Sequence, residues 1–323
     1  MDERLFRLLN DWQQDFPRVA EPFSVLGGAV GLPSEEVIEA FRLWRKEGIL
    51  NRIGPVFNQS FFGASALMAL AVPKERLDAV AALISALPEV NHNYEREHHF
   101  NLWFVVIASS TDRMLGLISE ITAATGLTPI VLPMEEAYHI NLGFDLRGHS
   151  STRTQGAVAA TSLSYETDGV EKNLLHAIQD GLQLVPRPYK ELGDQIGLSE
   201  MQVCELLDQW LSRGLFRRFG VVLRHQEIGY TANAMCVWDI PDSDVTSVGK
   251  LLGMESCVAL CYRRRRALPH WPYNLFCMIH GKGREEVLAK RSEIAQRLGL
   301  DAWPHDVLFS RRRFKLRGAK IVT

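Results

Sequence analysis

The amino-acid sequence predicts an α+β protein made by tandem duplication, in which each copy joins a winged helix-turn-helix to a ferredoxin-like β-α-β-β-α-β domain. Three observations support this prediction: an internal repeat, helical periodicity at the start of each half, and alternating strands and helices after it. The repeat has an offset of 166 residues and includes the infrequent tryptophan and the structurally demanding glycine. The matching residues are Leu8-Leu9 with Leu174-Leu175, Pro22-Phe23 with Pro188-Tyr189, Gly31-Leu32 with Gly197-Leu198, Trp44 with Trp210, Gly48 with Gly214, Arg52-Ile-Gly54 with Arg218-Phe-Gly220, and Gly63 with Gly229.

Each copy is expected to begin with three helices and a strand, the order of a winged helix-turn-helix. Gly31 and Gly197 stop the second helix of each copy, and Ser34 is a suitable N-cap for the third helix of the first copy. The expected elements span 4–12, 22–31, 35–47 and 49–57 in the first copy, and 170–180, 188–197, 198–213 and 215–223 in the second. The inner faces of the third helices carry Val37, Ile38, Phe41 and Trp44, and Val203, Leu206, Leu207 and Trp210.

The second part of each copy has the strand and helix order of a split β-α-β fold. The expected elements span 67–72, 75–87, the strand pair 90–108, 114–125 and 128–132 in the first copy, and 234–240, 245–252, 258–263, 274–280, 284–298 and 303–309 in the second. The inner face of the helix at 75–87 is expected to carry Leu77, Val80, Leu83 and Ile84. The predicted domains are 1–58 and 169–224 (helix-turn-helix) and 59–146 and 225–323 (ferredoxin-like), with 147–168, rich in small and hydroxyl residues, as a linker.

Composition excludes several classes of protein. Hydrophobic residues make up 46% of the chain and charged residues 23%, and the net charge of -2 gives no general attraction to nucleic acid or membranes. No apolar run approaches the roughly 20 residues of a membrane span, and the charged N-terminus is unlike a signal peptide. The five cysteines form no CxxC pair, so neither a zinc site nor a disulfide framework is indicated. A reducing, cytoplasmic location is expected.

The third helix of each helix-turn-helix lacks the charge pattern of a DNA-reading helix. The segment 34–47 has four acidic and three basic residues, with acids in its first turn, and the segment 198–213 has three acidic residues and one basic residue. Carboxylates at a helix N-terminus suit its dipole but repel phosphate. No sequence-specific DNA binding is therefore expected.

The strand pair at 90–108 concentrates reactive side chains that a structural hairpin does not need. Alternation places His92, Tyr94 and Arg96 on one face of their strand. The segment that follows adds further polar groups, which are His98, His99 and Asn101.

The second copy keeps part of this pattern. Tyr262 and Arg264 match Tyr94 and Arg96, and Arg266 shares their face, but Leu260 stands where the first copy has His92. An insertion of five residues, which includes His270 and Trp271, precedes the shared Asn-Leu at Asn274. The two copies have therefore diverged toward unequal roles.

Arginines cluster in the second copy at 263–266, which includes Arg263, and again at 311–313. Guanidinium groups pair bidentately with carboxylates, so a ligand with many carboxylates is a natural partner. Phosphate is an alternative, although no glycine-rich loop accompanies these arginines. A solvated basic sheet edge is the second alternative.

Histidines give the hairpins their acid–base chemistry. An imidazole can donate a proton near neutral pH or ligate iron, and His280 at the end of a second-copy strand is a further candidate. The spacing does not indicate a chelating metal site, and each single histidine also has a structural interpretation. The sequence leaves open whether a histidine ligates iron.

The helix-turn-helix followed by a ferredoxin-like domain resembles the Lrp/AsnC regulators, and the hairpin motifs carry a closer resemblance. The motifs are Arg52-Ile-Gly-Pro-Val-Phe-Asn58, His92-Asn-Tyr-Glu-Arg96 with Asn101-Leu-Trp103, and Cys261-Tyr-Arg with Trp271-Pro-Tyr-Asn274-Leu. They resemble the sirohaem decarboxylases, Lrp/AsnC-like proteins of d1-type haem biosynthesis and the alternative haem pathway. These proteins occur as paired subunits or as a fusion, and this chain resembles the fusion.

The resemblance implies removal of carbon dioxide from two acetate side chains of sirohaem, giving 12,18-didecarboxysirohaem without a separate cofactor, since the iron belongs to the substrate. It implies roles for His92, Tyr94 and Arg96, and for Asn101, Tyr262, Arg264, Trp271 and Asn274; His98 and His270 are added on chemistry. A homo-oligomer, a sister decarboxylase as a further partner, and no DNA or membrane partner are expected. The alternatives are a tetrapyrrole-sensing or, less favoured, an amino-acid-responsive transcription regulator.

Overall fold

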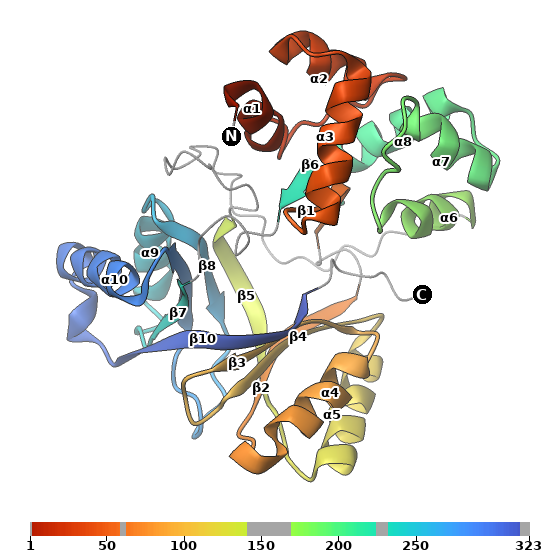
Figure 1. The fold of residues 1–323 in the computed structure, drawn as a ribbon. Coiled ribbons are helices and arrows are strands. Elements are labelled where there is room, and N and C mark those ends of the chain that lie inside the picture. The colour runs from red at the N-terminus through yellow and green to blue at the C-terminus, as the bar shows by residue number, and fades with distance from the viewer. Residues whose placement is uncertain (1, 59–62, 141–168, 224–231, 317–323) are drawn as a thin grey trace. The chain divides into compact units, whose positions relative to one another are not determined.

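A computed structural model describes residues 2–58, 63–140, 169–223 and 232–316 (Figure 1). The chain divides into two compact units. One unit contains both helix-turn-helix segments, and the other contains both ferredoxin-like segments. The predicted linker, 147–168, lies outside the described residues. The tandem α+β architecture is as predicted, and each unit is built from the equivalent parts of the two copies.

The helix-turn-helix unit has the predicted three helices and one strand per copy. In the first copy these are α1 (Glu3–Asn10), α2 (Pro22–Val30), α3 (Ser34–Lys46) and β1 (Leu50–Phe57). In the second copy they are α6 (Gly169–Ile178), α7 (Pro188–Ile196), α8 (Glu200–Ser212) and β6 (Phe216–Leu223). The two strands pair with each other, antiparallel, with Gly54 opposite Gly220 at the centre. The two strands, one predicted in each copy, therefore form one sheet shared by both copies.

The helix ends show one wrong prediction. Gly31 and Gly197 follow α2 and α7 in the left-handed conformation, with φ of 72° and 76°, as expected for helix-stopping glycines. Ser34, however, is the first residue of α3, and Pro33 is its N-cap with extended backbone. The repeat aligns Pro33 with Ser199, which does cap α8 through a capping box.

The second unit is a closed barrel of eight strands in the order β10-β3-β4-β2-β5-β8-β9-β7 (Figure 1). The first copy contributes β2 (Ala64–Leu70), α4 (Leu77–Ala86), β3 (Val90–Arg96), β4 (Leu102–Ala108), α5 (Thr111–Thr125) and β5 (Ile130–Ile140). The second contributes β7 (Ala232–Trp238), α9 (Val245–Gly253), β8 (Val258–Arg264), β9 (Leu275–Gly281), α10 (Arg284–Leu298) and β10 (His305–Leu316). Short 3-10 helices, Lys74–Arg76 and Leu300–Ala302, precede α4 and β10.

The last strand of each copy is longer than its hydrophobic pattern predicts, because it pairs with both copies. The start of β5 pairs with β2, and the part from Met134 to Ile140 pairs with β8. Likewise, the start of β10 pairs with β7, and the part from Ser310 to Leu316 pairs with β3. These exchanged halves leave no free edge, and they close the two sheets into one barrel.

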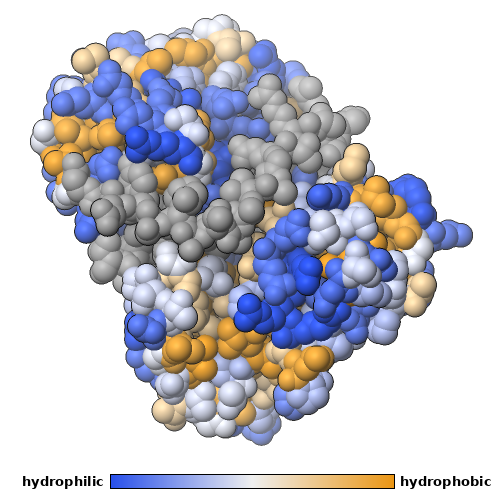
Figure 2. All heavy atoms as spheres, turned by 180° about the vertical axis from the view of Figure 1, so that it is seen from behind, coloured by the Kyte–Doolittle hydropathy of each residue, from blue (hydrophilic) through white to orange (hydrophobic). Residues whose placement is uncertain are grey.

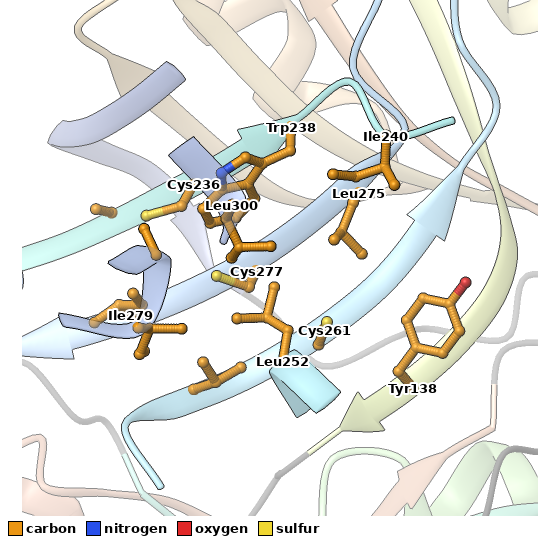
Figure 3. Close-up of a cluster of buried hydrophobic side chains, with 14 of the residues drawn as sticks. Tyr138, Cys236, Trp238, Ile240, Leu252, Cys261, Leu275, Cys277, Ile279 and Leu300 are labelled. Carbon is orange, nitrogen blue, oxygen red and sulfur yellow. The ribbon is translucent and has the colours of Figure 1, made fainter. Parts of the chain in front are cut away.

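Three cores fill this unit. One lies between the first-copy sheet and helices α4 and α5, and one lies between the second-copy sheet and helices α9 and α10 (Figure 3). The third lines part of the barrel interior and includes Trp103, Tyr262 and Trp271. Leu83 was predicted on the inner face of α4 but is 49% exposed. The stripe that faces the sheet passes through Leu77, Val80, Ala81 and Ile84 instead.

On the face shown in Figure 2, hydrophobic residues gather in several patches between hydrophilic ones. Within the described ranges, none of the helices combines the length and apolar character needed to cross a membrane.

Candidate functional site in the barrel interior

The strand β3 has one face toward α4 and one toward the barrel interior. Asn93 lies on the helix side, where its amide donates to the Ala81 carbonyl at 3.1 Å. Glu95 is also on that side, paired with Arg312. Alternation therefore turns His92, Tyr94 and Arg96 inward. The predicted shared face of these three residues is the inner wall of the barrel.

The barrel order repeats after four strands, so a rotation about the barrel axis relates the two copies. This rotation places β8 on the wall opposite β3, running in the same direction. Tyr262 is part of the interior core, and the Arg264 guanidinium lies 4.6 Å from the centre of its ring. The Arg96 guanidinium lies 5.9 Å from the ring centre of Tyr94. Two equivalent Tyr–Arg pairs thus face each other.

The two inward arginines are buried and make the same contact with the other copy. Arg96 is 7% exposed and Arg264 8%. Arg96 Nη1 donates to the Leu308 carbonyl at 2.9 Å, and Arg264 Nη1 donates to the Leu132 carbonyl at 2.7 Å. Among the described residues, neither guanidinium forms an ion pair with a carboxylate. Burial lowers the pKa of Arg96 to about 10 and lowers that of Arg264.

Two buried cations without carboxylate partners are energetically unfavourable. Their remaining donors can be satisfied by an anion that enters the barrel interior. Because guanidinium groups match carboxylates in shape and charge, the pair on opposite walls fits a ligand that carries more than one carboxylate.

The imidazole of His92 has a strongly lowered pKa. Burial lowers the pKa of its imidazole to about 4, so the ring is neutral at pH 7 in the free protein. Its Nδ1 is buried and has no hydrogen-bond partner among the described residues. The ring can therefore accept a proton or a hydrogen bond from a ligand, and an adjacent carboxylate would raise its pKa.

Tyr94 holds its proton in the same environment. Burial raises the pKa of the Tyr94 phenol, while the charges of Arg313 and Arg96 oppose this rise. Arg313 lies directly opposite Tyr94 in the β3–β10 ladder. The flanking Arg312 and Phe314 face the helix side, so Arg313 faces inward.

The sequence indicated the arginine run at 311–313, but it did not indicate Arg313 as a site residue. Only one residue in that run turns inward, and strand alternation could have separated it from its neighbours. Its proximity to Tyr94 depends on the pairing of β10 with a strand of the other copy, for which the sequence carries no local signal.

His98 lies beyond the end of β3, beside an aromatic cluster. Its Nδ1 accepts from the Phe100 amide at 2.9 Å, its Nε2 is 3.5 Å from Asp306, and its ring centre is 5.4 Å from that of Trp271. Burial lowers its pKa. At about 3.3 Å per strand residue, His92 and Arg96 are about 13 Å apart along β3. His92 and His98 therefore lie near opposite ends of β3.

Trp271 is buried against Trp103, with ring centres 4.9 Å apart. Its Nε1 is buried without a hydrogen-bond partner among the described residues. His280 faces inward on β9, opposite Asn233 of β7. His99 and His270 are exposed.

Arg263 and Arg266 were expected to require an external anion, but the protein supplies the anions itself. Arg266 pairs with Asp239 at 2.7 Å and Asp242 at 2.8 Å. Arg263 pairs with Glu135 at 2.9 Å. These ion pairs neutralise the two guanidinium groups within the protein itself.

Asn101 and Asn274 have structural partners. The Asn101 side chain accepts from the Val72 amide at 2.9 Å and donates to the Val72 carbonyl at 2.8 Å. Asn274 makes the same two bonds to Ile240, both at 2.9 Å. The shared asparagines therefore tie each hairpin to the neighbouring backbone, and this explains their presence in both copies.

No group of three or more metal-ligating side chains occurs in the part of the chain that the structure describes. The inner walls instead present Tyr–Arg pairs, a neutral histidine and aromatic rings, a set suited to a flat, polyanionic ligand.

Comparisons with known proteins identify the family. The family model of the siroheme decarboxylase NirDL-like HTH domain matches residues 6–50 and 171–217, and that of the AsnC-like ligand binding domain matches 62–139 and 227–315. The siroheme decarboxylase NirDL subunit of Paracoccus denitrificans (strain Pd 1222) is 38% identical over 99% of this chain and 98% of its own length. The siroheme decarboxylase NirL subunit of Stutzerimonas stutzeri is 47% identical over 46% of this chain and 86% of its own length.

A solved structure shows the same likeness. The crystal structure of the siroheme decarboxylase NirDL in co-complex with an iron-uroporphyrin III analogue has 28% sequence identity and a TM-score of 0.71, covering 99% of this chain and 94% of that chain. Matching domain families in both copies and high identity over the full length establish the relationship. The chain belongs to the siroheme decarboxylase family.

Proposed function

We propose that this chain decarboxylates sirohaem at the inner wall of the barrel, converting two acetate side chains to methyl groups to give 12,18-didecarboxysirohaem in d1-type haem biosynthesis. The observation that carries the proposal is the pair of buried guanidinium groups, Arg96 and Arg264, without carboxylate partners among the described residues. Family membership supports the reaction, and a related enzyme has been crystallised with an iron-uroporphyrin III analogue.

In this reaction each acetate carboxylate leaves as carbon dioxide, and its methylene carbon gains one proton. The electron pair of the broken carbon–carbon bond passes into the macrocycle and returns when the carbon is protonated. No separate cofactor is proposed, because the iron macrocycle is the substrate itself. The protein must orient the macrocycle, hold its other carboxylates and supply the proton.

Arg96 and Arg264 would hold carboxylates that do not react, from opposite walls. His92 would supply the proton. Its imidazole is neutral in the free protein, and a carboxylate brought beside it would raise its pKa, so that it becomes protonated only when substrate is bound. Tyr94, which keeps its proton, would donate a hydrogen bond to the same group. Loss of the carboxylate would then favour transfer of the imidazolium proton.

Anaerobic incubation of the purified chain with sirohaem tests the proposal. Mass spectrometry of the extracted macrocycle is expected to show the loss of two carbon dioxide molecules. Unchanged sirohaem after incubation with a folded protein that binds it would refute the proposed activity.

The alternative, a tetrapyrrole-sensing regulator, requires DNA binding by the helix-turn-helix unit. Two of the three basic residues of α3 are used within the protein. Arg42 donates to the Leu184 carbonyl at 2.8 Å, and Arg45 donates to the Leu182 carbonyl at 3.3 Å. With acidic Glu35 in the first turn, little charge is left for phosphate contacts. This arrangement favours a scaffolding role for the unit.

A further inference from the structure

The duplication makes each position on the inner wall comparable with its counterpart in the other copy. Rotation about the barrel axis relates β3 to β8, β4 to β9, and β5 to β10. The binding positions are kept, since Tyr94 and Arg96 correspond to Tyr262 and Arg264. Even the carbonyl acceptors of the two arginines, Leu308 and Leu132, are counterparts.

The positions of the reactive and additional charged side chains are not kept in the second copy. Leu260 stands in the second copy where the first has His92. Ala137 lies opposite Tyr262 in the β5–β8 ladder, the position that Arg313 occupies opposite Tyr94. The wall formed by β3 and β10 therefore carries an imidazole and an additional guanidinium, whereas the equivalent wall formed by β8 and β5 carries two aliphatic side chains.

From this asymmetry we infer that both acetates of sirohaem are decarboxylated at one reaction centre, formed by His92, Tyr94 and Arg313. The opposite wall, which carries Tyr262 and Arg264, binds carboxylates but performs no decarboxylation. We assign Arg313 as the residue that binds the reacting end of the substrate. Its counterpart on the opposite wall, Ala137, carries no charge and cannot do so. The inference rests on the proposed decarboxylase function and specifies where that function occurs.

The substrate's own symmetry makes one centre sufficient. The two reacting acetates lie on neighbouring pyrrole rings and are related by a half-turn about the in-plane axis that passes between those rings. The same half-turn exchanges the two neighbouring propionates. A macrocycle that has lost one carbon dioxide can therefore present its second acetate to the same residues, while Arg96 and Arg264 again hold carboxylates.

His280 is the one inward histidine of the second copy among the described residues, and it sits on β9, where the first copy has Ile107 on β4. It is not the counterpart of His92. If it acted as the acid of a second centre, its loss would block one carbon dioxide release and leave the other intact.

The test counts carbon dioxide molecules lost per macrocycle in His92→Leu, Arg313→Ala and His280→Ile, which install the residue of the opposite copy. Each variant is incubated anaerobically with sirohaem until no further change occurs, and the macrocycle is analysed by mass spectrometry at intervals, so that both the rate and the number of carbon dioxide losses are measured. One centre predicts that His92→Leu and Arg313→Ala slow both losses together, by more than tenfold, and that His280→Ile still completes both.

If there were two centres, a variant that disables one of them would release one carbon dioxide molecule per macrocycle instead of two. Quantitative accumulation of the monodecarboxylated macrocycle with any of the three variants would overturn the inference. Wild-type protein and His305→Gln, which removes an exposed imidazole elsewhere on the barrel, are the reference proteins. If these references release no carbon dioxide, the proposed function itself fails, so the two failures are distinguishable. Arg313→Ala alters a partly exposed residue and keeps the test valid if His92→Leu does not fold.

Discussion

Replacing Arg96 with methionine should separate substrate binding from stability. Burial lowers the pKa of this guanidinium from 12.5 to about 10, and at 1.36 kcal/mol per pKa unit the charge costs about 3 kcal/mol in the free protein. The substitution removes that cost but leaves the Leu308 carbonyl without its donor, which costs about 1–3 kcal/mol. The free energy of unfolding of Arg96→Met should therefore equal that of the wild type within about 2 kcal/mol, or exceed it.

The affinity for sirohaem, in contrast, should decrease in Arg96→Met. A charge-assisted hydrogen bond contributes about 1.5–3 kcal/mol, so the Kd for sirohaem should rise by about 10- to 100-fold. Urea unfolding measures the stability, and anaerobic spectroscopic titration measures the affinity. The control is Arg291→Met, which removes another buried arginine, on α10, that is paired with Asp301 at 2.7 Å. A large loss of stability in Arg96→Met with unchanged Kd would refute the reasoning, because Arg96 would then be a structural residue.

Three further predictions follow from the same contacts. Asn274→Ala breaks two buried hydrogen bonds to Ile240 and should lower the free energy of unfolding by about 2–4 kcal/mol; stability equal to that of the wild type in urea unfolding would contradict the structural assignment. Because the pKa of His92 is about 4 in the folded protein, against an ordinary value of 6.5 for an exposed imidazole, the unfolded chain takes up the proton first as pH falls. Stability should thus decrease by at most about 3 kcal/mol from pH 6.5 to 4, and His92→Gln should reduce this decrease, as acid titrations of both proteins will show. In gel-shift assays the protein should give no sequence-specific DNA complex at physiological salt, and a nanomolar complex would restore the regulator interpretation.

The sequence alone predicted the architecture because its signals are local. Helical periodicity, helix-stopping glycines such as Gly31, and the repeat at a fixed offset each depend on neighbouring residues. That His92, Tyr94 and Arg96 share one face followed from strand alternation alone, whereas the structure showed that this face is the inner wall. The closer resemblance to the decarboxylases was likewise carried by contiguous motifs, and the family comparisons confirm it.

Tertiary structure decided which polar residues already have partners. The sequence treated Arg266 and Arg96 alike, yet Arg266 meets the carboxylate of Asp239, while Arg96 donates to the backbone carbonyl of Leu308. The Asn101 amide, grouped with the site, is used by the Val72 backbone. Such pairings join segments distant in the chain, so no local pattern encodes them.

The barrel closure is the largest feature that only the fold determined. The exchanged halves of β5 and β10 bring Arg313 opposite Tyr94 and Ala137 opposite Tyr262. A sequence repeat shows that two copies exist and where they differ. Only the pairing between them shows that His92 and Arg313 lie on one wall, because strand register across copies depends on long-range packing rather than on nearby residues.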